Sequence, residues 1–512
     1  MDKTVENNFH NAGARRFNRG IIYSAFLILS IVAVYWRVFK YPYIQDDWYI
    51  INSIRTLGNA EYLSSIFSAT GNLFYRPVGQ LYFLLLYNLS GLDPIGFHIG
   101  AILIHFLSSL LIVAIANELT GDKLISWTAG FFYAVSVTVH LDSMLWMVGI
   151  YDIGGALFFF LSFLLFIKKR VTFSAIVYCL ALFTKESTII LLPVLLLYQL
   201  HRDNSGKKFL EKFLSEVKAL WKHGIILLIY FLIRIPSLAS VPIESDNPYQ
   251  IQLTGIHVLD NITSFFKWAL EGLNPYFELP LSGISIIIVF SILFFGVYRI
   301  ARIEKAKTLF LGGWMALGLL PVIFLTNHFF RYYLTYSLPA FIIFILYGVR
   351  ASISIFSLKH YVHAMVFIIV ICTSVISSSI YFGVLDRQGL NVPTIPGSGN
   401  LIRKGAVVHL VQNYLLKEYP TLPEHVSLVF NWVPIISFGG SIGPRIWYND
   451  PTIHVYEVLR VNKDSSGMHV KLSPDENQQP ARVDPKNTLL IKYHGDYIRT
   501  TNIDDFVQGA PN

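Results

Sequence analysis

The sequence is poor in cysteine and in charged residues, and each shortage excludes a class of protein. Only two of the 512 residues are cysteines, Cys179 and Cys372, and both lie within apolar runs. They provide neither a disulfide framework nor a thiolate metal site. Charged residues make up 14% of the chain, whereas soluble domains carry about a quarter. With 54% hydrophobic residues, the composition predicts an integral membrane protein.

A net charge of +8 could indicate nucleic-acid binding, but the basic residues fall in short clusters between apolar runs. This distribution is typical of the positive-inside rule. Crossing a bilayer core takes roughly 17 to 25 apolar residues, and on this basis we expect about eleven transmembrane helices. The expected spans lie near 21–39, 96–117, 125–140, 152–167, 171–184, 187–200, 223–240, 282–299, 308–325, 332–349 and 362–383.

The basic clusters fall in alternate loops and place the N-terminus in the cytoplasm. This topology requires that residues 78–92 do not cross the membrane. The run is short and contains Gln80 and Asn88, so we expect an interfacial helix there. The first extracytoplasmic loop then covers about 40–95 and contains at least two short helices.

The composition changes after residue 383, where Pro, Gly, Asp and Lys return to the frequencies of soluble proteins. Alternating apolar residues predict strands within 425–433, 453–461 and 487–493, and 401–419 is typical of a helix. We therefore expect a catalytic membrane domain, 1–383, followed by a small extracytoplasmic α/β domain, 384–512.

Two adjacent carboxylates, Asp46 and Asp47, follow the first span in the stretch KYPYIQDDWYIINSI. On a helix their side chains point about 100° apart, so one can face a site while the other caps the helix or faces water. Capping and catalysis are equally compatible with the sequence at this point.

Basic residues occur on the same side of the membrane. Arg76 precedes Pro77 in NLFYRP, and it could reach lipid headgroups or bind a phosphate with two hydrogen bonds. In LFTKESTIILLP, Lys185 and Glu186 interrupt a long apolar stretch. We interpret Glu186 as the turn of a helical hairpin and leave Lys185 open as a phosphate contact.

Three further polar residues lie in VTVHLDSMLWMVGIYDIGG. His140 and Asp142 are expected at the extracytoplasmic end of a span, where a solvated loop is the ordinary explanation. Asp152 lies inside an apolar segment, where a carboxylate costs about 2.5–3.5 kcal/mol to insert. Such a residue favours a functional role.

The stretch TNHFFRYYLTYSLPA adds His328, Arg331, Tyr332 and Tyr333 at the start of a span. Tyrosines are common at the membrane interface and arginines at helix ends, so this stretch alone is ordinary. Together, however, the carboxylates and cations share one membrane face. A carboxylate base with a cationic phosphate clamp suits attack on a lipid-linked phosphosugar. Asp46, Asp47, Asp142 and His140 would be the ligands of a divalent ion, which the sequence neither requires nor specifies.

The order of these motifs resembles the GT-C superfamily of membrane glycosyltransferases. An acidic pair, YRP, GLDPIGFH, HLDSMLWMVGIYD, FTKES and RYYLTYSLP follow one another between about residues 20 and 345. The resemblance is closest to the protein mannosyltransferase-like branch, including members with tetratricopeptide repeats. This chain lacks those repeats, and it has Phe330 and Ile150 where relatives often have an acidic and a basic residue.

The resemblance implies a helical bundle and an inverting transfer from a polyprenyl-phosphate sugar to a hydroxyl acceptor outside the cytoplasm. The acceptor could be a glycan, lipid or protein. The implied roles are the general base for Asp46, supporting acidic roles for Asp47 and Asp142, donor phosphate binding for Arg76, Lys185 and Arg331, and substrate binding for His140, Asp152, His328, Tyr332 and Tyr333.

Two other classes remain open. A flippase for a polyprenyl-linked lipid also needs cations, but we find neither an inverted repeat nor charges near the membrane midplane. A non-catalytic subunit of an envelope complex would use the C-terminal domain for interaction. Since no eukaryotic retention signal occurs, we expect a bacterial inner membrane protein.

Overall fold

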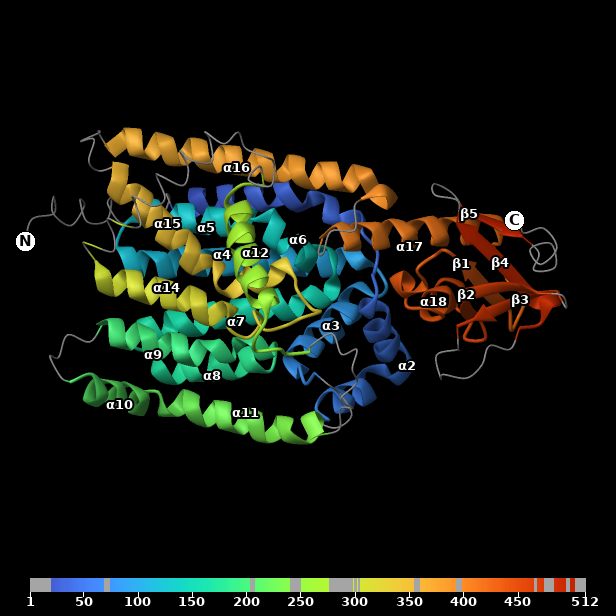
Figure 1. The fold of residues 1–512 in the computed structure, drawn as a ribbon, viewed down its shortest axis with the longest axis horizontal. Coiled ribbons are helices and arrows are strands. Elements are labelled where there is room, and N and C mark those ends of the chain that lie inside the picture. The colour runs from blue at the N-terminus through green and yellow to red at the C-terminus, as the bar shows by residue number, and fades with distance from the viewer. Residues whose placement is uncertain are drawn as a thin grey trace, which may run out of the picture.

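The computed structural model is an elongated helical bundle with a small mixed sheet at one end (Figure 1). The residues that it describes are 20–68, 74–202, 208–239, 250–275, 298, 302, 304–353, 360–392, 398–464, 467–473, 483–493 and 498–501.

Four described helical segments are long and apolar enough to cross a membrane, so the chain is a multi-pass membrane protein. They are Gly20–Lys40, Pro94–Thr120, Met147–Ile167 and Ala364–Asn391. A bent pair, Lys123–Val135 and Val137–Leu145, would be a fifth. The prediction of eleven full-length spans was therefore wrong for the described part of the chain, and the span predicted at 282–299 lies outside it except for residue 298.

Helix length explains most of this correction. Predicted spans at 171–184 and 187–200 form α8 (Val171–Leu182) and α9 (Leu191–Arg202). Each has 12 residues and so extends about 18 Å, whereas a bilayer core is about 30 Å thick.

The predicted span at 125–140 is broken by a bend of 50° between α5 (Lys123–Val135) and α6 (Val137–Leu145). Ser136 lies at the break, and its hydroxyl contacts the carbonyl oxygens of Phe132 and Gly272, each at 2.6 Å. A hydroxyl that bonds the preceding turn and a distant helix favours such a bend.

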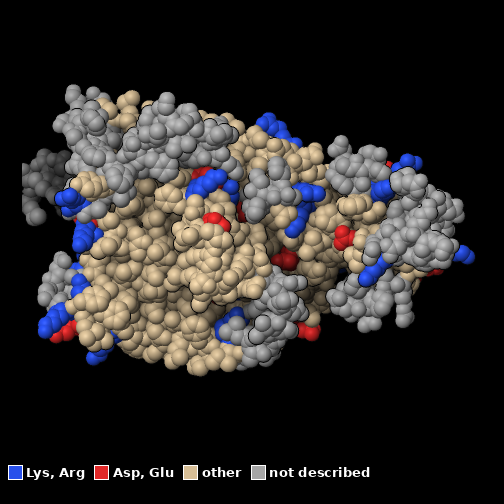
Figure 2. Space-filling model, viewed as in Figure 1, with Lys and Arg blue, Asp and Glu red and all other residues tan. Residues whose placement is uncertain are grey.

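The first loop contains two helices, as the sequence predicted, but only α3 (Pro77–Ser90) is short, since α2 (Asp46–Ile66) has 21 residues and is interrupted at Gly58, where φ is 71°. The other helices of the bundle are η1 (Trp36–Lys40), α4 (Pro94–Thr120), η2 (Met147–Gly149), α7 (Ile150–Ile167), η3 (Glu186–Ile190), α10 (Phe209–Ala219), α11 (Trp221–Ala239), α12 (Ile256–Leu273), α14 (Lys305–Leu319), η5 (Arg331–Tyr336), α15 (Leu338–Ile353), α16 (His360–Gln388) and η7 (Gly389–Asn391). Most of the bundle surface in Figure 2 is uncharged, and lysines and arginines gather at the end far from the sheet.

The C-terminal part forms a five-stranded sheet in the order β3-β2-β1-β4-β5. The inner strands β2, β1 and β4 are parallel, while β3 and β5 pair antiparallel at the edges. The three predicted strands and the helix appear within three residues of their expected ends, as β1, β2, β4 and α17, whereas β3 and β5 were not predicted. The elements are α17 (Ser398–Glu418), β1 (Ser427–Asn431), η8 (Ile435–Phe438), α18 (Ile442–Tyr448), β2 (His454–Asp464), β3 (Gly467–Leu472), η9 (Pro485–Asn487), β4 (Thr488–Tyr493) and β5 (Ile498–Thr501).

This sheet domain packs directly on the first loop of the bundle. The Gln45 amide donates to the Ser437 carbonyl at 3.0 Å. The His409 ring nitrogen Nε2 lies 2.8 Å from the Lys40 carbonyl. At Gly405, a Cβ atom would lie only 2.7 Å from Cδ1 of Tyr41, so α17 can approach the loop closely because this residue is glycine.

The start of α2 is fixed to the start of α7 through the side chain of Asp47. This fully buried carboxylate accepts backbone hydrogen bonds from Ile44 at 2.9 Å, Val148 at 3.0 Å and Met147 at 3.4 Å. Burial raises the pKa of Asp47 well above its usual value, and the three N–H groups oppose that shift. The carboxylate thus joins segments that are distant in the sequence.

We expect Asp47→Ala to lower the unfolding temperature of the purified protein in detergent. The substitution leaves three backbone donors without their acceptor, and each buried unpaired donor costs about 1–3 kcal/mol. Asp47→Asn keeps one oxygen acceptor and should be less destabilising. Asp46→Asn is the matched control and should leave the unfolding temperature unchanged. An equal unfolding temperature for Asp47→Ala and the parent protein would contradict the assignment.

Candidate functional site

A cavity of about 440 Å³ lies beside α2, at the end of the bundle that carries the sheet domain. Its wall comes from α2, from the residues before α3, from the α6–α7 connection and from the segments around residues 185 and 330. The structure brings together in this wall several residues that the sequence singled out: Asp46, Arg76, Asp152, Lys185, His328 and Tyr332.

Asp46 is the first residue of α2 and lies in the wall of this cavity. Its side chain is exposed, and among the described residues its carboxylate has no hydrogen-bond or ion-pair partner. Although the side chain is exposed, the surrounding protein displaces part of the water around the carboxylate. This partial desolvation raises the pKa of Asp46, while the positive charge of Lys404 on α17 opposes the rise.

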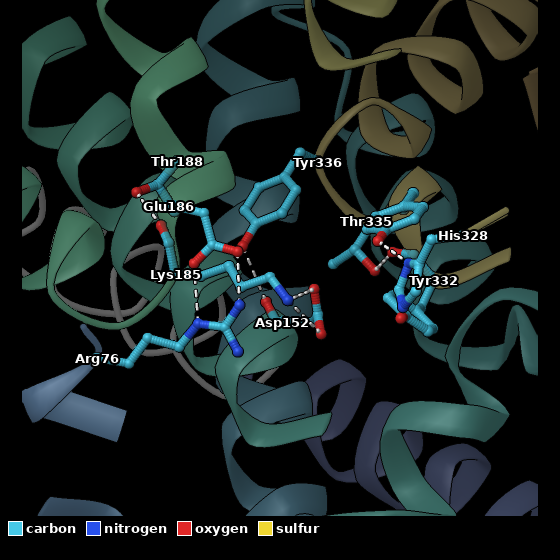
Figure 3. A network of polar contacts seen from close by, with 10 residues as sticks. Arg76, Asp152, Lys185, Glu186, Thr188, His328, Tyr332, Thr335 and Tyr336 are labelled. Carbon is cyan, nitrogen blue, oxygen red and sulfur yellow. Dashed lines mark hydrogen bonds and ion pairs between the residues drawn. The ribbon is translucent and has the colours of Figure 1, made fainter. Parts of the chain in front are cut away.

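Arg76 forms a two-pronged ion pair with Glu186 (Figure 3). Its Nε and Nη2 atoms lie 2.8 and 2.5 Å from the two carboxylate oxygens. The guanidinium also lies over the rings of Phe74 and Tyr151, at 4.1 and 4.9 Å from their centres. Burial would raise the pKa of Glu186, but Arg76 and Lys185 outweigh it and lower that pKa to about 2. The pair therefore stays ionised at neutral pH.

Lys185 makes a second ion pair, with Asp152 in the first turn of α7. Its ammonium lies 3.2 and 3.3 Å from the two carboxylate oxygens (Figure 3). The backbone on each side is also held: Thr188 donates to the Lys185 carbonyl at 2.8 Å, and Tyr336 donates to the Asp152 carbonyl at 3.3 Å. This pairing compensates the charge of a carboxylate that the sequence placed inside an apolar segment.

His328 lies in the same wall, with its Nδ1 atom 2.5 Å from the hydroxyl of Tyr333. Burial, followed by the nearby charges of Lys185 and Arg76, lowers the pKa of His328 to about 4. At neutral pH its imidazole is therefore uncharged and able both to donate and to accept a hydrogen bond.

The remaining predicted residues lie outside the cavity lining. Asp47 is buried in its backbone contacts. His140 and Asp142 are buried within α6, so neither lies in a solvated loop. The ring of His140 packs 4.6 Å from that of His105 and 4.5 Å from that of Tyr133. Tyr333 contacts two residues of the lining, His328 through its hydroxyl and Tyr332 through its ring.

Arg331 is also outside the lining, where it pairs with Glu271 of α12 at 2.6 Å. Both side chains are almost fully buried. Lys267, one turn earlier on α12, approaches the same carboxylate at 3.7 Å.

The described residues contain no group of three or more His, Cys, Asp or Glu side chains placed to hold a metal ion. Asp46, Asp47, Asp142 and His140 therefore do not form a metal site in this part of the chain.

The sequence analysis interpreted Glu186 only as part of a helical hairpin turn, and it did not identify Glu271 or Lys404. The signal for Glu271 was a carboxylate within the apolar helix stretch KWALEGL. For Glu186 the signal was an acid beside a base in a long apolar run. Lys404 gave no signal of its own, because it reaches Asp46 from a helix more than 350 positions further along the chain.

No protein-family model matches this chain. Among known proteins it is similar to protein O-mannosyltransferases, which confirms the resemblance found in the motif order. Protein O-mannosyl-transferase TMTC2 of Mus musculus and its Homo sapiens counterpart are each 35% identical to it over 94 residues. The match covers 18% of this chain but only 11% of the length of those relatives.

Among solved structures, the crystal structure of ArnT from Cupriavidus metallidurans in the apo state aligns with 87% of this chain and 86% of its own. The sequence identity is 12% and the TM-score is 0.48.

The Arg331–Glu271 pair should show strong coupling in a double-mutant cycle. We expect Glu271→Leu or Arg331→Met alone to cost about 3–5 kcal/mol, because each leaves a buried charge without its main partner. The double variant should cost clearly less than the sum. Unfolding temperatures in detergent provide the comparison, and additive losses would show that the two charges do not depend on each other.

Proposed function

We propose that this protein is a glycosyltransferase that moves a sugar from a polyprenyl-phosphate donor to a hydroxyl acceptor on the extracytoplasmic side. One observation carries the proposal: Asp46, a carboxylate without a partner among the described residues, shares a cavity with two cations, Arg76 and Lys185. Similarity to protein O-mannosyltransferases supports sugar transfer as the reaction class.

In this mechanism Asp46 is the general base. It accepts the proton of the acceptor hydroxyl while the hydroxyl oxygen forms a bond to the anomeric carbon of the donor sugar. The bond between that carbon and the phosphate oxygen breaks, and its electron pair leaves with the polyprenyl phosphate. Attack opposite the leaving group inverts the anomeric configuration. The exposure of Asp46 toward the cavity suits this role, because the acceptor must reach its oxygen atoms.

Arg76 and Lys185 bind the donor phosphate and stabilise the charge that builds up as it leaves. Arg76 uses two of its N–H groups on Glu186, and a guanidinium has five, so others remain for a phosphate oxygen. Lys185 similarly keeps donors beyond those shared with Asp152. His328 and Tyr332 line the cavity and bind sugar hydroxyls. Arg331, held by Glu271 outside the lining, has no direct part in this mechanism.

The proposed membrane orientation is based on the distribution of basic residues. Lysines and arginines gather at the end of the bundle opposite the cavity (Figure 2). The positive-inside rule favours the cytoplasm for that end and the outer side for the cavity. A polyprenyl chain would lie along the uncharged bundle surface, with its phosphate at the cavity.

Asp46→Asn should reduce the rate of sugar transfer by about 10²–10⁴-fold, because the amide cannot accept the proton. Donor binding should persist, since Arg76 and Lys185 are unchanged. The assay follows release of label from radiolabelled polyprenyl-phosphate sugars by the purified protein. Full turnover by the variant would overturn the role of Asp46, and movement of the intact lipid without label release would favour the flippase.

Lys404→Met should move the acid limb of the pH–rate profile toward higher pH. Asp46 acts as a base only when ionised, and the positive charge of Lys404 favours the ionised form. Loss of that charge therefore raises the pKa of Asp46 further, and a higher pH is needed for the same fraction of active enzyme. Lys404→Arg keeps the charge and serves as the control. An acid limb that stays in place in Lys404→Met would contradict the coupling.

A further inference from the structure

A second cavity, of about 310 Å³, lies between the first loop and the sheet domain. It shares no lining residue with the first cavity, but both take part of their wall from residues 40–50. The bundle contributes this loop and the start of α4, and the sheet domain contributes α17 and α18. A smaller space of about 120 Å³ adjoins it and shares Lys40, Tyr41 and His409.

Aromatic rings dominate this wall, which includes Tyr41, Tyr43, Trp48 and Trp447. The rings of Trp48 and Trp447 meet at 81° with centres 5.9 Å apart, and those of Tyr43 and Trp48 meet at 72° and 5.5 Å. Trp48 and Tyr43 are almost fully buried in these contacts, so the half-buried ring of Trp447 is the one of the three that a ligand can reach. An aromatic ring suits a ligand with an apolar face.

The same wall carries the half-buried amide of Gln412. It has no partner in the described part of the chain, and it offers two donors and an acceptor. A polar ligand in the cavity could therefore form hydrogen bonds with this side chain.

The charged groups beside the wall compensate each other. Lys40 lies 2.7 Å from one carboxylate oxygen of Asp386, and Tyr41 donates to the other at 2.9 Å. This pair carries no net charge, so it favours neither an anion nor a cation, and a neutral ligand suits the wall. A neutral ligand with one apolar face and many hydroxyl groups fits best, and a pyranose has this chemistry.

We propose that this second cavity binds a neutral sugar residue of the acceptor, so that the acceptor is a glycan. This inference rests on the proposed function, because the cavity is an acceptor site only if the protein transfers a sugar. Residues 40–50 line both cavities: Lys40 to Tyr43 and Trp48 line the second, and Asp46 between them lines the first. A glycan held at Trp447 and Gln412 would thus be anchored beside the catalytic carboxylate while its terminal hydroxyl reaches Asp46.

Saturation-transfer NMR on the full-length protein in detergent tests the site with three neutral trisaccharides: mannotriose, maltotriose and chitotriose. We expect at least one to receive saturation from the aromatic protons. Gln412→Ala should weaken its binding about fivefold, the loss of one ordinary hydrogen bond. Asn413→Ala is the matched control, because this exposed amide is adjacent on α17 and outside the lining. Its binding should equal that of the parent protein.

Three outcomes would overturn the inference. The first is that none of the trisaccharides binds, and the second is that Gln412→Ala and Asn413→Ala bind equally. The third is that native mass spectrometry finds a co-purified phospholipid that Gln412→Ala loses, which would make the cavity a lipid site. The Asp46→Asn variant separates the two proposals, because it should keep trisaccharide binding while losing transfer. If Asp46→Asn kept transfer, the proposed function would fail while the measured sugar binding stood.

Discussion

The buried carboxylate of Asp47 is the constraint on which the arrangement of the site depends. Its three backbone hydrogen bonds tie the start of α2 to the connection that leads into α7. Because neighbouring residues on a helix diverge by about 100°, fixing Asp47 inside directs Asp46 to a different face. That face lines the cavity. The two acids therefore have different roles: Asp47 fixes the backbone, and Asp46 stays accessible from the cavity.

Charge compensation is the second constraint. The cations of the site lie in a poorly hydrated wall, and each has a carboxylate within ion-pair distance: Glu186 for Arg76 and Asp152 for Lys185. Isolated charges would be costly there, so the pairs keep the empty site stable. A phosphate must then share these cations with their carboxylates. Under the proposed function the donor phosphate thus adds to the existing ion pairs, and the carboxylates weaken its binding, which favours release of the phosphate after transfer.

The sequence predicted the membrane class, the presence of two helices in the first loop and three of the five described C-terminal strands, because each depends on local composition or periodicity. Six of the residues that it singled out line the cavity, because charged and polar residues are conspicuous in apolar chains, whereas Asp47, His140, Asp142, Arg331 and Tyr333 lie outside the lining. It could not predict the bend at Ser136, which depends on the carbonyl of Gly272. Nor could it pair Arg331 with Glu271 or Asp46 with Lys404, because nothing local links partners on separate helices.

The sheet domain contacts the residues on both sides of the acidic pair. Its η8 segment accepts a hydrogen bond from Gln45, the residue before Asp46, and Trp447 of α18 packs against Trp48 just after it. The acidic pair is therefore bracketed by contacts from the other domain. Contacts from both domains therefore hold this segment: Asp47 ties it to the bundle, while Gln45 and Trp48 contact the sheet domain. The base thus lies on a segment with bundle contacts on one side and sheet-domain contacts on the other, and glycine at position 405 lets α17 approach that segment closely.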